Sequence, residues 1–420
     1  MSALFRHRHY VLFMVTLVYV VNYLDRQILA ILLPFIKKEF DASDTALGLL
    51  SGPAFALIYA TLGIPLALVA DRVNRRNVIA ISLALFSVFT VACNYVGNFW
   101  QLVAARAGVG IGEAGTGPSI NSILSDLYPP QARAKALGIY SAGLNIGLLI
   151  AFFGGALMAQ HYGWRSAFLV AGLSGIVILA VFLLTVEEPK RGHSEALADT
   201  ADAHSLVATA KYLWSQKSFR YLSIGTSMSA FGGYAGIAFV PLFLVRTHHL
   251  TPAQVGLLLS ITTGIFGFIG TAMSGVIADR VGKKDIRRVM LVPVVAALIA
   301  LPFAPVFYLS PNLTLVILAL ALPQFLGASY LAPAFAATQG LVPLRMRATA
   351  AAILIFILNI IALSFGPLWV GVFSDLLRPY VGEDSLRYAL LSTTITAMTG
   401  ALLYYLSSRH LAEDMAKVSK

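Results

Sequence analysis

The sequence predicts an all-α membrane protein with twelve transmembrane helices in two pseudo-symmetric six-helix bundles. Three observations predict it: an apolar composition, apolar runs of about 20 residues or more, and a repeat that relates the two halves. Of 420 residues, 58% are hydrophobic and 12% charged, against roughly 25% charged in soluble domains. Most of the surface must therefore face lipid, where only helices or closed barrels satisfy the backbone. The runs lack the alternation of barrel strands, so the spans are helices.

The apolar runs place six spans in each half of the chain. In the first half they cover residues 10–36, 46–70, 78–97, 99–124, 135–160 and 166–186. In the second half they cover residues 219–245, 253–278, 288–309, 313–340, 348–374 and 388–408. The first run continues to about Phe35, which is too long for the apolar core of a signal peptide, so we interpret it as a permanent span.

The only long polar stretch separates the two halves. We expect an N-terminal bundle over residues 1–186, a cytoplasmic linker over 187–217 and a C-terminal bundle over 218–420. Five apolar residues of the linker share one helical face: Leu206, Val207, Ala210, Leu213 and Trp214. A short helix on the membrane surface and a partly disordered segment are both consistent with this pattern.

The distribution of basic residues predicts the orientation. Of the 30 Lys and Arg residues, 22 lie in the tails, linker and loops of one side, and six lie in the loops of the other. The positive-inside rule makes the first side cytoplasmic, with both termini on it. Because these residues occupy short loops rather than one soluble face, we expect no nucleic-acid partner. We expect a monomer in the lipid bilayer of a plasma membrane, specifically a bacterial inner membrane.

An internal repeat relates the loops that follow the second and eighth spans. The first loop reads Ala67-Leu-Val-Ala-Asp71-Arg72-Val-Asn74-Arg75-Arg76, and the second reads Gly275-Val-Ile-Ala-Asp279-Arg280-Val-Gly282-Lys283-Lys284. The two aspartates are 208 residues apart, close to half the chain length. A second pair, Arg133 and Arg347, follows spans four and ten at an offset of 214 residues. A period of this length indicates duplicated architecture, which in membranes is typical of transporters.

These loops resemble the signature of the major facilitator superfamily, although Ala67 and Asn74 replace two of its glycines in the first copy. The resemblance implies the major facilitator fold and secondary transport by alternating access. It also implies a latch between the cytoplasmic ends of the two halves. The gating residues that it assigns are Asp71, Arg72, Arg75, Asp279, Arg280, Arg133 and Arg347.

Two further stretches resemble the spinster family, whose eukaryotic members export sphingosine phosphate or lysophospholipids. Asn22-Tyr23-Leu24-Asp25-Arg26 lies in the first span, and Arg106-Ala-Gly-Val-Gly-Ile-Gly-Glu113 lies in the fourth. The resemblance implies an amphipathic anionic substrate. Proton-coupled organic-anion symporters of the same superfamily have a similar first-span motif, so a small organic or aromatic acid remains an alternative substrate.

Four ionisable residues lie near the middle of spans: Asp25, Arg26, Arg106 and Glu113. Each costs roughly 2.5–3.5 kcal/mol at a helix centre if unpaired. Because they are two of each sign, we expect them to pair in a wetted interior. Arginine keeps its proton at any relevant pH, whereas a carboxylate in a drying cavity can take one. We therefore expect proton coupling at Asp25 and Glu113 and anion binding at Arg26 and Arg106, although a purely structural ion cluster is the alternative.

The second half has no charge at the corresponding depths. It offers aromatic residues instead, and an ionic wall facing an aromatic wall suits an amphipathic anion. The residues that we expect to assist Arg26 and Arg106 in binding are Asn22, Tyr23, Phe231, Tyr234 and Tyr330. We expect no metal, cofactor or catalytic residue, because the sequence shows no nucleophile–base pairing, metal-ligand cluster or nucleotide loop. A membrane enzyme that uses the two carboxylates is a remote alternative.

Overall fold

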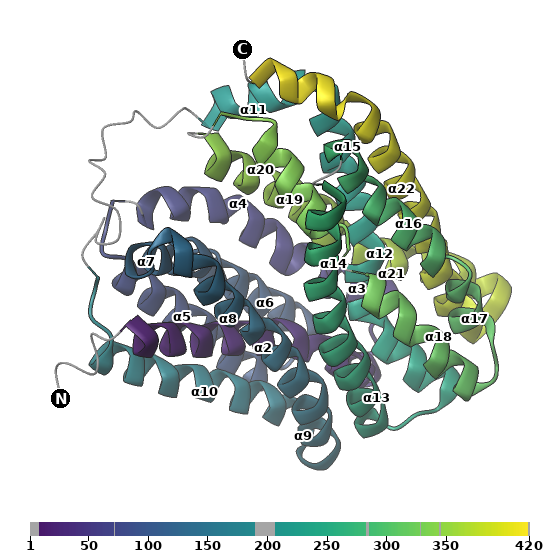
Figure 1. Cartoon of the computed structure of the whole chain (residues 1–420). Coiled ribbons are helices and arrows are strands. Elements are labelled where there is room, and N and C mark those ends of the chain that lie inside the picture. Colours follow the sequence, from purple (N-terminus) through teal and green to yellow (C-terminus); the bar gives the residue numbers. More distant parts are fainter. Residues whose placement is uncertain are drawn as a thin grey trace. The chain divides into compact units, whose positions relative to one another are not determined.

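The structure is a computed structural model and describes residues 8–70, 72–189, 206–282, 285–327, 329–343 and 346–418. Helices make up nearly all of these ranges, which contain no strand (Figure 1). The chain divides into two compact units. Unit 1 comprises residues 1–42, 53–200 and 250–260, and unit 2 comprises residues 43–52, 201–249 and 261–420. Two short segments, 43–52 and 250–260, thus belong to the unit formed by the other half of the sequence.

Unit 1 is built from long helices and short connecting pieces. They are α2 (Arg8–Phe40), α4 (Pro53–Ala70), α5 (Arg75–Ala92), η1 (Cys93–Tyr95), α6 (Phe99–Glu113), α7 (Thr116–Leu127), α8 (Pro130–Leu149), η2 (Ile150–Gly154), α9 (Gly155–Tyr162), α10 (Trp164–Thr185) and α13 (Pro252–Leu259). α2 packs against α8 and α10, and α5 packs against α6 and α10. α2 is therefore surrounded by unit 1, and most of its apolar residues are buried.

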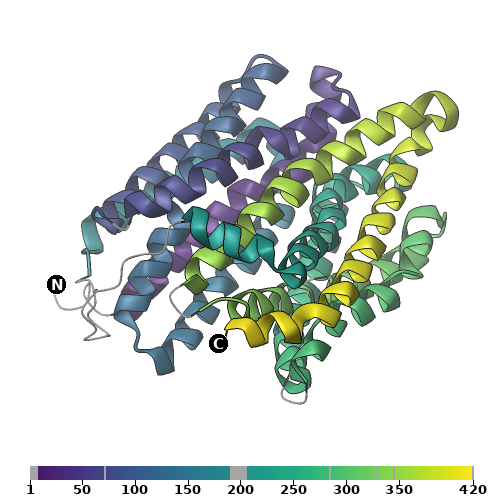
Figure 2. The same cartoon turned by 90° about the horizontal axis from the view of Figure 1, so that it is seen from above.

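Unit 2 contains the remaining helices. They are α3 (Asp44–Ser51), α11 (Leu206–Ser215), α12 (Lys217–His248), η3 (Ser260–Phe266), α14 (Gly267–Gly282), α15 (Ile286–Val289), α16 (Leu291–Ala300), α17 (Phe303–Leu309), α18 (Leu313–Leu326), α19 (Leu331–Gly340), α20 (Arg347–Leu358), η5 (Asn359–Ser364), α21 (Phe365–Val381), η6 (Gly382–Asp384) and α22 (Ser385–Val418). α22, yellow in Figures 1 and 2, packs along α12.

Helix occupies every one of the twelve ranges in which the sequence predicts a span. Within the described residues, nine helices are long and apolar enough to cross a membrane, or ten if one bent pair is a single span. One of these stretches, Arg347–Val418, contains α20, α21 and α22. The helices α6 and α7 are not among the nine, because a break at Ala114 and Gly115 leaves each of them too short.

Polar side chains at the helix starts explain several of the boundaries. Asn74 and Asn98 precede α5 and α6, and each side chain accepts a hydrogen bond from the backbone N–H three residues later. Such caps satisfy amide groups that have no partner within the helix. Gly163, between α9 and α10, has φ of 84°, a left-handed conformation that glycine adopts without steric cost.

Glycines bring α6 close to its neighbours in unit 1. A Cβ atom on Gly110 would lie 2.7 Å from the carbonyl oxygen of Phe55 in α4. One on Gly112 would lie 2.4 Å from the backbone nitrogen of Phe86 in α5. Only a residue without a side chain permits such contacts. The close approach sets the positions of the charged residues of α6 relative to α4 and α5.

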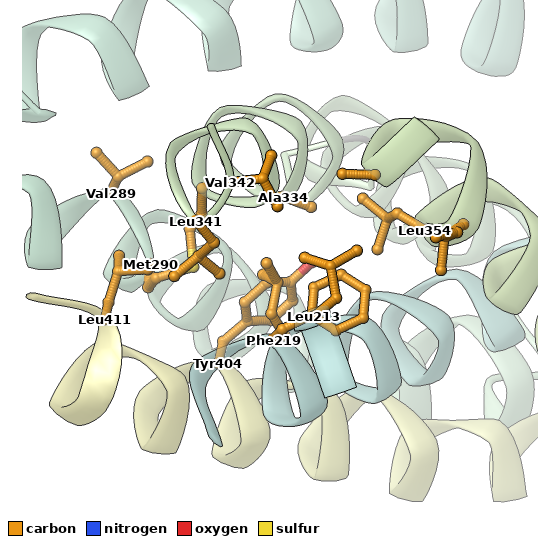
Figure 3. Close-up of a cluster of buried hydrophobic side chains, with 14 residues drawn as sticks. Leu213, Phe219, Val289, Met290, Ala334, Leu341, Val342, Leu354, Tyr404 and Leu411 are labelled. Atoms are coloured by element: carbon orange, nitrogen blue, oxygen red, sulfur yellow. The ribbon is translucent and has the colours of Figure 1, made fainter. Parts of the chain in front are cut away.

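A buried apolar cluster at one end of unit 2 joins α11 to the helices of the second half (Figure 3). Leu213 of α11 is fully buried and packs in this cluster with Phe219, Leu354 and Tyr404. The linker therefore contains the short helix that the sequence allowed. Its apolar residues are divided, however, because Val207 and Trp214 are exposed while Leu213 faces the core. The buried side of α11 is formed by Thr209 and Leu213, which are both fully buried.

Candidate functional site

The four ionisable residues predicted within spans lie together in unit 1. α2 supplies Asp25 and Arg26, and α6 supplies Arg106 and Glu113. Asp25, Arg106 and Glu113 have 1%, 1% and 2% of their surface exposed, and the Arg26 side chain has 11%. Burial of four charged groups is tolerable only where they are paired, and each of them is paired with a group of opposite sign.

Arg26 forms an ion pair with Glu113. Its Nη2 and Nε lie 2.5 and 3.1 Å from Glu113 Oε2. The guanidinium carbon also lies over three aromatic rings, 4.6 Å from the ring centre of Tyr59, 4.9 Å from Phe55 and 5.2 Å from Tyr23. Planar guanidinium groups bind both carboxylates and aromatic faces, which explains why arginine suits this position.

Arg106 forms the second ion pair, with Asp25. Its Nη1 lies 3.3 Å from Asp25 Oδ2 and 3.3 Å from the main-chain oxygen of the same residue. The other carboxylate oxygen, Oδ1, lies 2.6 Å from the hydroxyl of Thr90, which is fully buried on α5. The geometry therefore separates the two carboxylates into one pair with Arg26 and one with Arg106.

Three buried polar atoms of this cluster have no hydrogen-bond partner among the described residues: Asn22 Nδ2, Arg106 Nε and Glu113 Oε1. Two of them are donors and one is an acceptor. Buried polar atoms in folded proteins usually have a partner, whether protein, water or ligand. The cluster can therefore donate hydrogen bonds to a bound anion without breaking an existing contact at Asn22 or at Arg106 Nε.

Tyr23 lies beside the ion pairs and is part of an aromatic group. Its ring packs edge-on against Tyr19 at 4.9 Å, and Tyr19 stacks on Tyr140 of α8 at 4.3 Å. Tyr19, Tyr59 and Tyr140 were missed by the sequence reasoning. Tyr19 lies four residues before Tyr23 on the same helix, so the spacing could have indicated it, whereas nothing in the sequence pairs Tyr59 or Tyr140 with Arg26.

The three aromatic residues predicted in the second half lie together within unit 2. Phe231 is buried in an apolar cluster with Leu358 and Ala362, and Tyr234 and Tyr330 pack against that cluster. This grouping is consistent with a shared role, but the contacts themselves are those of helix packing between α12, α20 and η5.

The predicted gating residues occupy different environments. Arg75 is buried at the start of α5, where it binds Asp126, Glu188 and the Ser122 hydroxyl, all within unit 1. Arg133 is half-buried and donates to the main-chain oxygen of Ser125 at 2.9 Å.

The other members of the gating set are exposed or undescribed. Arg72, Arg280 and Arg347 are exposed. Asp71 and the side chain of Asp279 lie outside the described residues.

A buried charged group in unit 2 was not anticipated from the sequence. Asp44, at the start of α3, is fully buried and accepts from Arg246 Nη2 and Nη1 at 2.7 and 3.0 Å and from the Ser374 hydroxyl at 2.7 Å. Asp375 in turn accepts from the backbone N–H groups of Asp44 and Thr45. Asp44 and Arg246 are 202 residues apart near span ends, where a charge is unremarkable by itself, so the sequence carried no signal for this pair.

The described residues contain no group of three or more His, Cys, Asp or Glu side chains that could hold a metal ion. Within the same part of the chain, the ionisable cluster of unit 1 is built from two carboxylates, two guanidinium groups and a hydroxyl. Guanidinium groups are suited to binding an anion, and carboxylates can take up and release protons.

Comparisons with known proteins identify the family. The model of the Major Facilitator Superfamily matches residues 15–367 and 222–414. An MFS-type efflux pump of Mycolicibacterium smegmatis is 34% identical over 96% of this chain and 93% of its own length. The sphingosine-1-phosphate transporter SPNS2 of Xenopus tropicalis is 26% identical over 96% of this chain and 82% of its own length.

A solved structure agrees with these sequence matches. A bacterial homologue of the human lysosomal transporter Spinster, crystallised in an inward-facing and unoccupied conformation, superposes with a TM-score of 0.89 at 29% identity. The superposition covers 97% of this chain and 98% of the other. This chain therefore belongs to the major facilitator superfamily, and it is a multi-pass membrane transporter that resembles the spinster proteins.

Proposed function

We propose that the protein is a proton-coupled secondary transporter that moves an amphipathic anion, lysolipid-like or sphingolipid-like, by alternating access. The observation that carries this proposal is the cluster of unit 1, in which each of two buried carboxylates is paired with an arginine. Replacement of a buried ion pair by apolar side chains of similar volume is often neutral or stabilising, so packing alone does not require these charges. A transport cycle that couples proton binding to anion binding gives these four charges a use.

The ion pair of Arg26 and Glu113 suggests how proton binding and anion binding are coupled. While Glu113 is ionised, it occupies the Nε–Nη2 side of the Arg26 guanidinium. A proton on Glu113 removes its charge and weakens that contact, so an anionic head group can take its place. Proton binding and anion binding then favour each other at Arg26, and the unpartnered donors Asn22 Nδ2 and Arg106 Nε offer further hydrogen bonds to the head group.

The substrate class is supported by the relatives and by the sequence motifs. One relative is named as a transporter of sphingosine-1-phosphate, which has an anionic head and a long apolar tail. Another is named only as an efflux pump. A small organic or aromatic acid carried by proton symport is the alternative, because a head-binding cluster of this kind also fits a compact carboxylate.

The coupling role of the carboxylates is tested by neutral, isosteric variants. Asp25→Asn and Glu113→Gln keep the side-chain shape but remove the titratable group. We expect each variant to lose proton-driven uptake of lysophosphatidate or sphingosine phosphate into proteoliposomes, by at least about tenfold, because transport can no longer exchange a proton at that site. The measurement is uptake at several external pH values with and without an imposed pH gradient.

Asp384→Asn is a suitable control, because Asp384 is exposed and, among the described residues, forms its ion pair with the nearby Arg387. It should transport like the wild type. Proton coupling through the cluster would be wrong if Asp25→Asn and Glu113→Gln both transported with the wild-type pH dependence. Wild-type uptake of a short organic acid but of neither lipid would instead favour the alternative substrate.

We also propose that the repeated Asp–Arg loops latch the cytoplasmic ends in the outward-facing state. Asp71→Asn should weaken that latch and shift the resting population toward the inward-facing state. Spin-label distances across the cytoplasmic side would measure the shift. Arg378→Gln, an exposed substitution outside the two loops, is the control, and an unchanged distance distribution for Asp71→Asn would contradict the gating role.

The proposed location is a bacterial inner membrane, with the protein as a monomer and both termini in the cytoplasm. It is supported by the excess of Lys and Arg on the side of the termini. A protease-sensitive tag at either end should be cut in inside-out vesicles and protected in intact spheroplasts. The reverse pattern would contradict the orientation.

A further inference from the structure

Thr90 contacts Asp25 from α5, although its residue type and its place in the sequence gave no reason to include it in the cluster. We infer that Thr90 is a positioning residue that serves Asp25 in both protonation states and makes Oδ1 the oxygen that carries the proton. The inference rests on the proposed proton coupling at Asp25, and it adds to that proposal the partner and the atom.

The hydroxyl of Thr90 has two acceptor atoms at hydrogen-bond distance but only one proton. Its Oγ1 lies 2.6 Å from Asp25 Oδ1 and 2.8 Å from the main-chain oxygen of Phe86. While Asp25 is ionised, the hydroxyl donates to Oδ1. When Oδ1 carries a proton, that group donates to Oγ1, and the Thr90 hydroxyl turns to donate to the Phe86 oxygen. Each protonation state therefore has a complete set of bonds without movement of a heavy atom.

The second oxygen of Asp25 has a different environment. Oδ2 faces Nη1 of Arg106 at 3.3 Å. A guanidinium group has donors only, so a proton on Oδ2 would point at another donor. Oδ1 faces a hydroxyl, which can donate or accept. The chemistry of the two partners thus assigns the proton to Oδ1.

The other ionisable groups near Asp25 do not offer an acceptor at this position. Arg26 and Arg106 are donors. Glu113 is held by Arg26 through Oε2, and among the described residues no hydrogen bond joins its other oxygen to Asp25. Cys93 of η1 is buried, and its thiol donates to the main-chain oxygen of Phe89 at 3.3 Å. From the other helices packed on α2, Tyr140 of α8 stacks on Tyr19 and Arg165 of α10 pairs with Glu39.

Infrared titration of the full-length protein tests the inference without any substrate. A protonated carboxyl group has a C=O stretching band that moves to higher frequency when its O–H loses a hydrogen bond. Aspartate labelled with ¹³C distinguishes the Asp25 band from that of Glu113, and its loss in Asp25→Asn assigns it. We expect this band to move upward in Thr90→Val, which has the same shape without the hydroxyl, and to keep the wild-type frequency in Thr90→Ser.

Ser87→Ala is the matched control, because Ser87 is a fully buried hydroxyl on the same helix whose oxygen has no partner among the described residues. Its band should be that of the wild type. Thr90→Ala tests the same bond if Thr90→Val does not fold.

A wild-type band frequency in folded Thr90→Val or Thr90→Ala would overturn the inference, and so would the absence of an assignable Asp25 acid band at every pH. The first result leaves the proposed function untouched, whereas the second also counts against proton coupling at Asp25. The function is tested separately by the pH dependence of transport in Asp25→Asn.

Discussion

Arg26 has the most complete set of contacts of any residue in the cluster, and those contacts depend on the shape of its side chain. The guanidinium group is held between a carboxylate and three aromatic rings at 4.6–5.2 Å. A lysine would keep the charge, but its compact ammonium group cannot stack on rings or donate through a planar fork. A lysine substitution at position 26 therefore separates the effect of the charge from the effect of the guanidinium geometry.

We predict that Arg26→Lys weakens binding of lysophosphatidate about tenfold. The lost stacking and fork contacts are together worth about 1–2 kcal/mol, and 1.4 kcal/mol is a factor of ten in affinity. Arg165→Lys is a matched control, because Arg165 also lies over an aromatic ring, that of Trp164, and pairs with a carboxylate, Glu39. Its side chain is 32% exposed. Binding measured by fluorescence or calorimetry should be unchanged there, and equal losses in the two variants would argue against a binding role for Arg26.

The charged members of the cluster could be found from the sequence because charge inside a span is costly. That cost marked Asp25, Arg26, Arg106 and Glu113 without any knowledge of the fold. It could not say which carboxylate pairs with which arginine, since either pairing is open until the relative positions of α2 and α6 are known. It also could not mark Thr90, whose hydroxyl can bond within its own helix and so sits in a span at little cost.

At the scale of helices, the structure shows a pair of equivalent contacts that the sequence repeat did not reveal. Gly256 of α13 packs on η2, where a Cβ atom would lie 2.3 Å from the Phe152 carbonyl oxygen. Gly52, which follows α3, packs on η5, where a Cβ atom would lie 2.2 Å from the Ser364 carbonyl oxygen. The two glycines are 204 residues apart, and the residues they contact, Phe152 and Ser364 in the π-helical segments η2 and η5, are 212 apart, close to the offsets of the sequence repeat. The duplication therefore extends to backbone contacts within each unit.

We predict that Gly256→Ala destabilises unit 1. The added methyl group meets backbone at Phe152 and the Cβ of Ala156 at 2.7 Å, so helices rather than a flexible side chain must move. Overpacking of this kind costs about 1–3 kcal/mol, which should lower the unfolding midpoint by at least about 2 °C. Cys93 is buried and is the only cysteine, so a thiol-reactive dye reports unfolding directly.

Gly233→Ala is the control for that prediction, because a Cβ atom on Gly233 would have nothing within 4 Å. Its midpoint should equal that of the wild type or rise slightly, since alanine favours helix over glycine. Equal midpoints for Gly256→Ala and the wild type would show that the contact at Phe152 is looser than its geometry indicates.

The sequence predicted the positions of the helices well because each span must be long and apolar. It could not predict the π-helical segments, which depend on the packing of neighbouring helices rather than on local preference. For α11 the sequence pattern placed all the apolar residues on one face, and this grouping was wrong. Periodicity grouped Leu213 with Trp214, whereas packing against Phe219 and Leu354 draws Leu213 inward and leaves Trp214 exposed.

At the scale of the whole molecule, the two units differ in chemistry although their architecture is duplicated. Unit 1 holds the ion pairs of Asp25 and Glu113 within its spans. In unit 2 the buried pair of Asp44 and Arg246 lies near span ends, and the aromatic residues predicted for substrate binding pack in an apolar cluster around Phe231. A transporter of compact, highly charged substrates would benefit from fixed charge near the middle of the spans in both units. This asymmetry supports an amphipathic substrate with one anionic end.

We predict that affinity for lysophosphatidates rises with acyl chain length. Burial of each methylene contributes about 0.8 kcal/mol, or roughly fourfold in affinity, until no further methylene can be buried. The head group contributes a charge-assisted hydrogen bond to Arg26, which is the same for every member of the series. Arg26→Ala should therefore weaken all members by a similar factor and leave the slope with chain length unchanged. Calorimetry with each lipid below its micelle concentration measures both quantities. An affinity that is flat with chain length, together with tight binding of a short dicarboxylate, would replace the lipid with a small organic acid as the substrate.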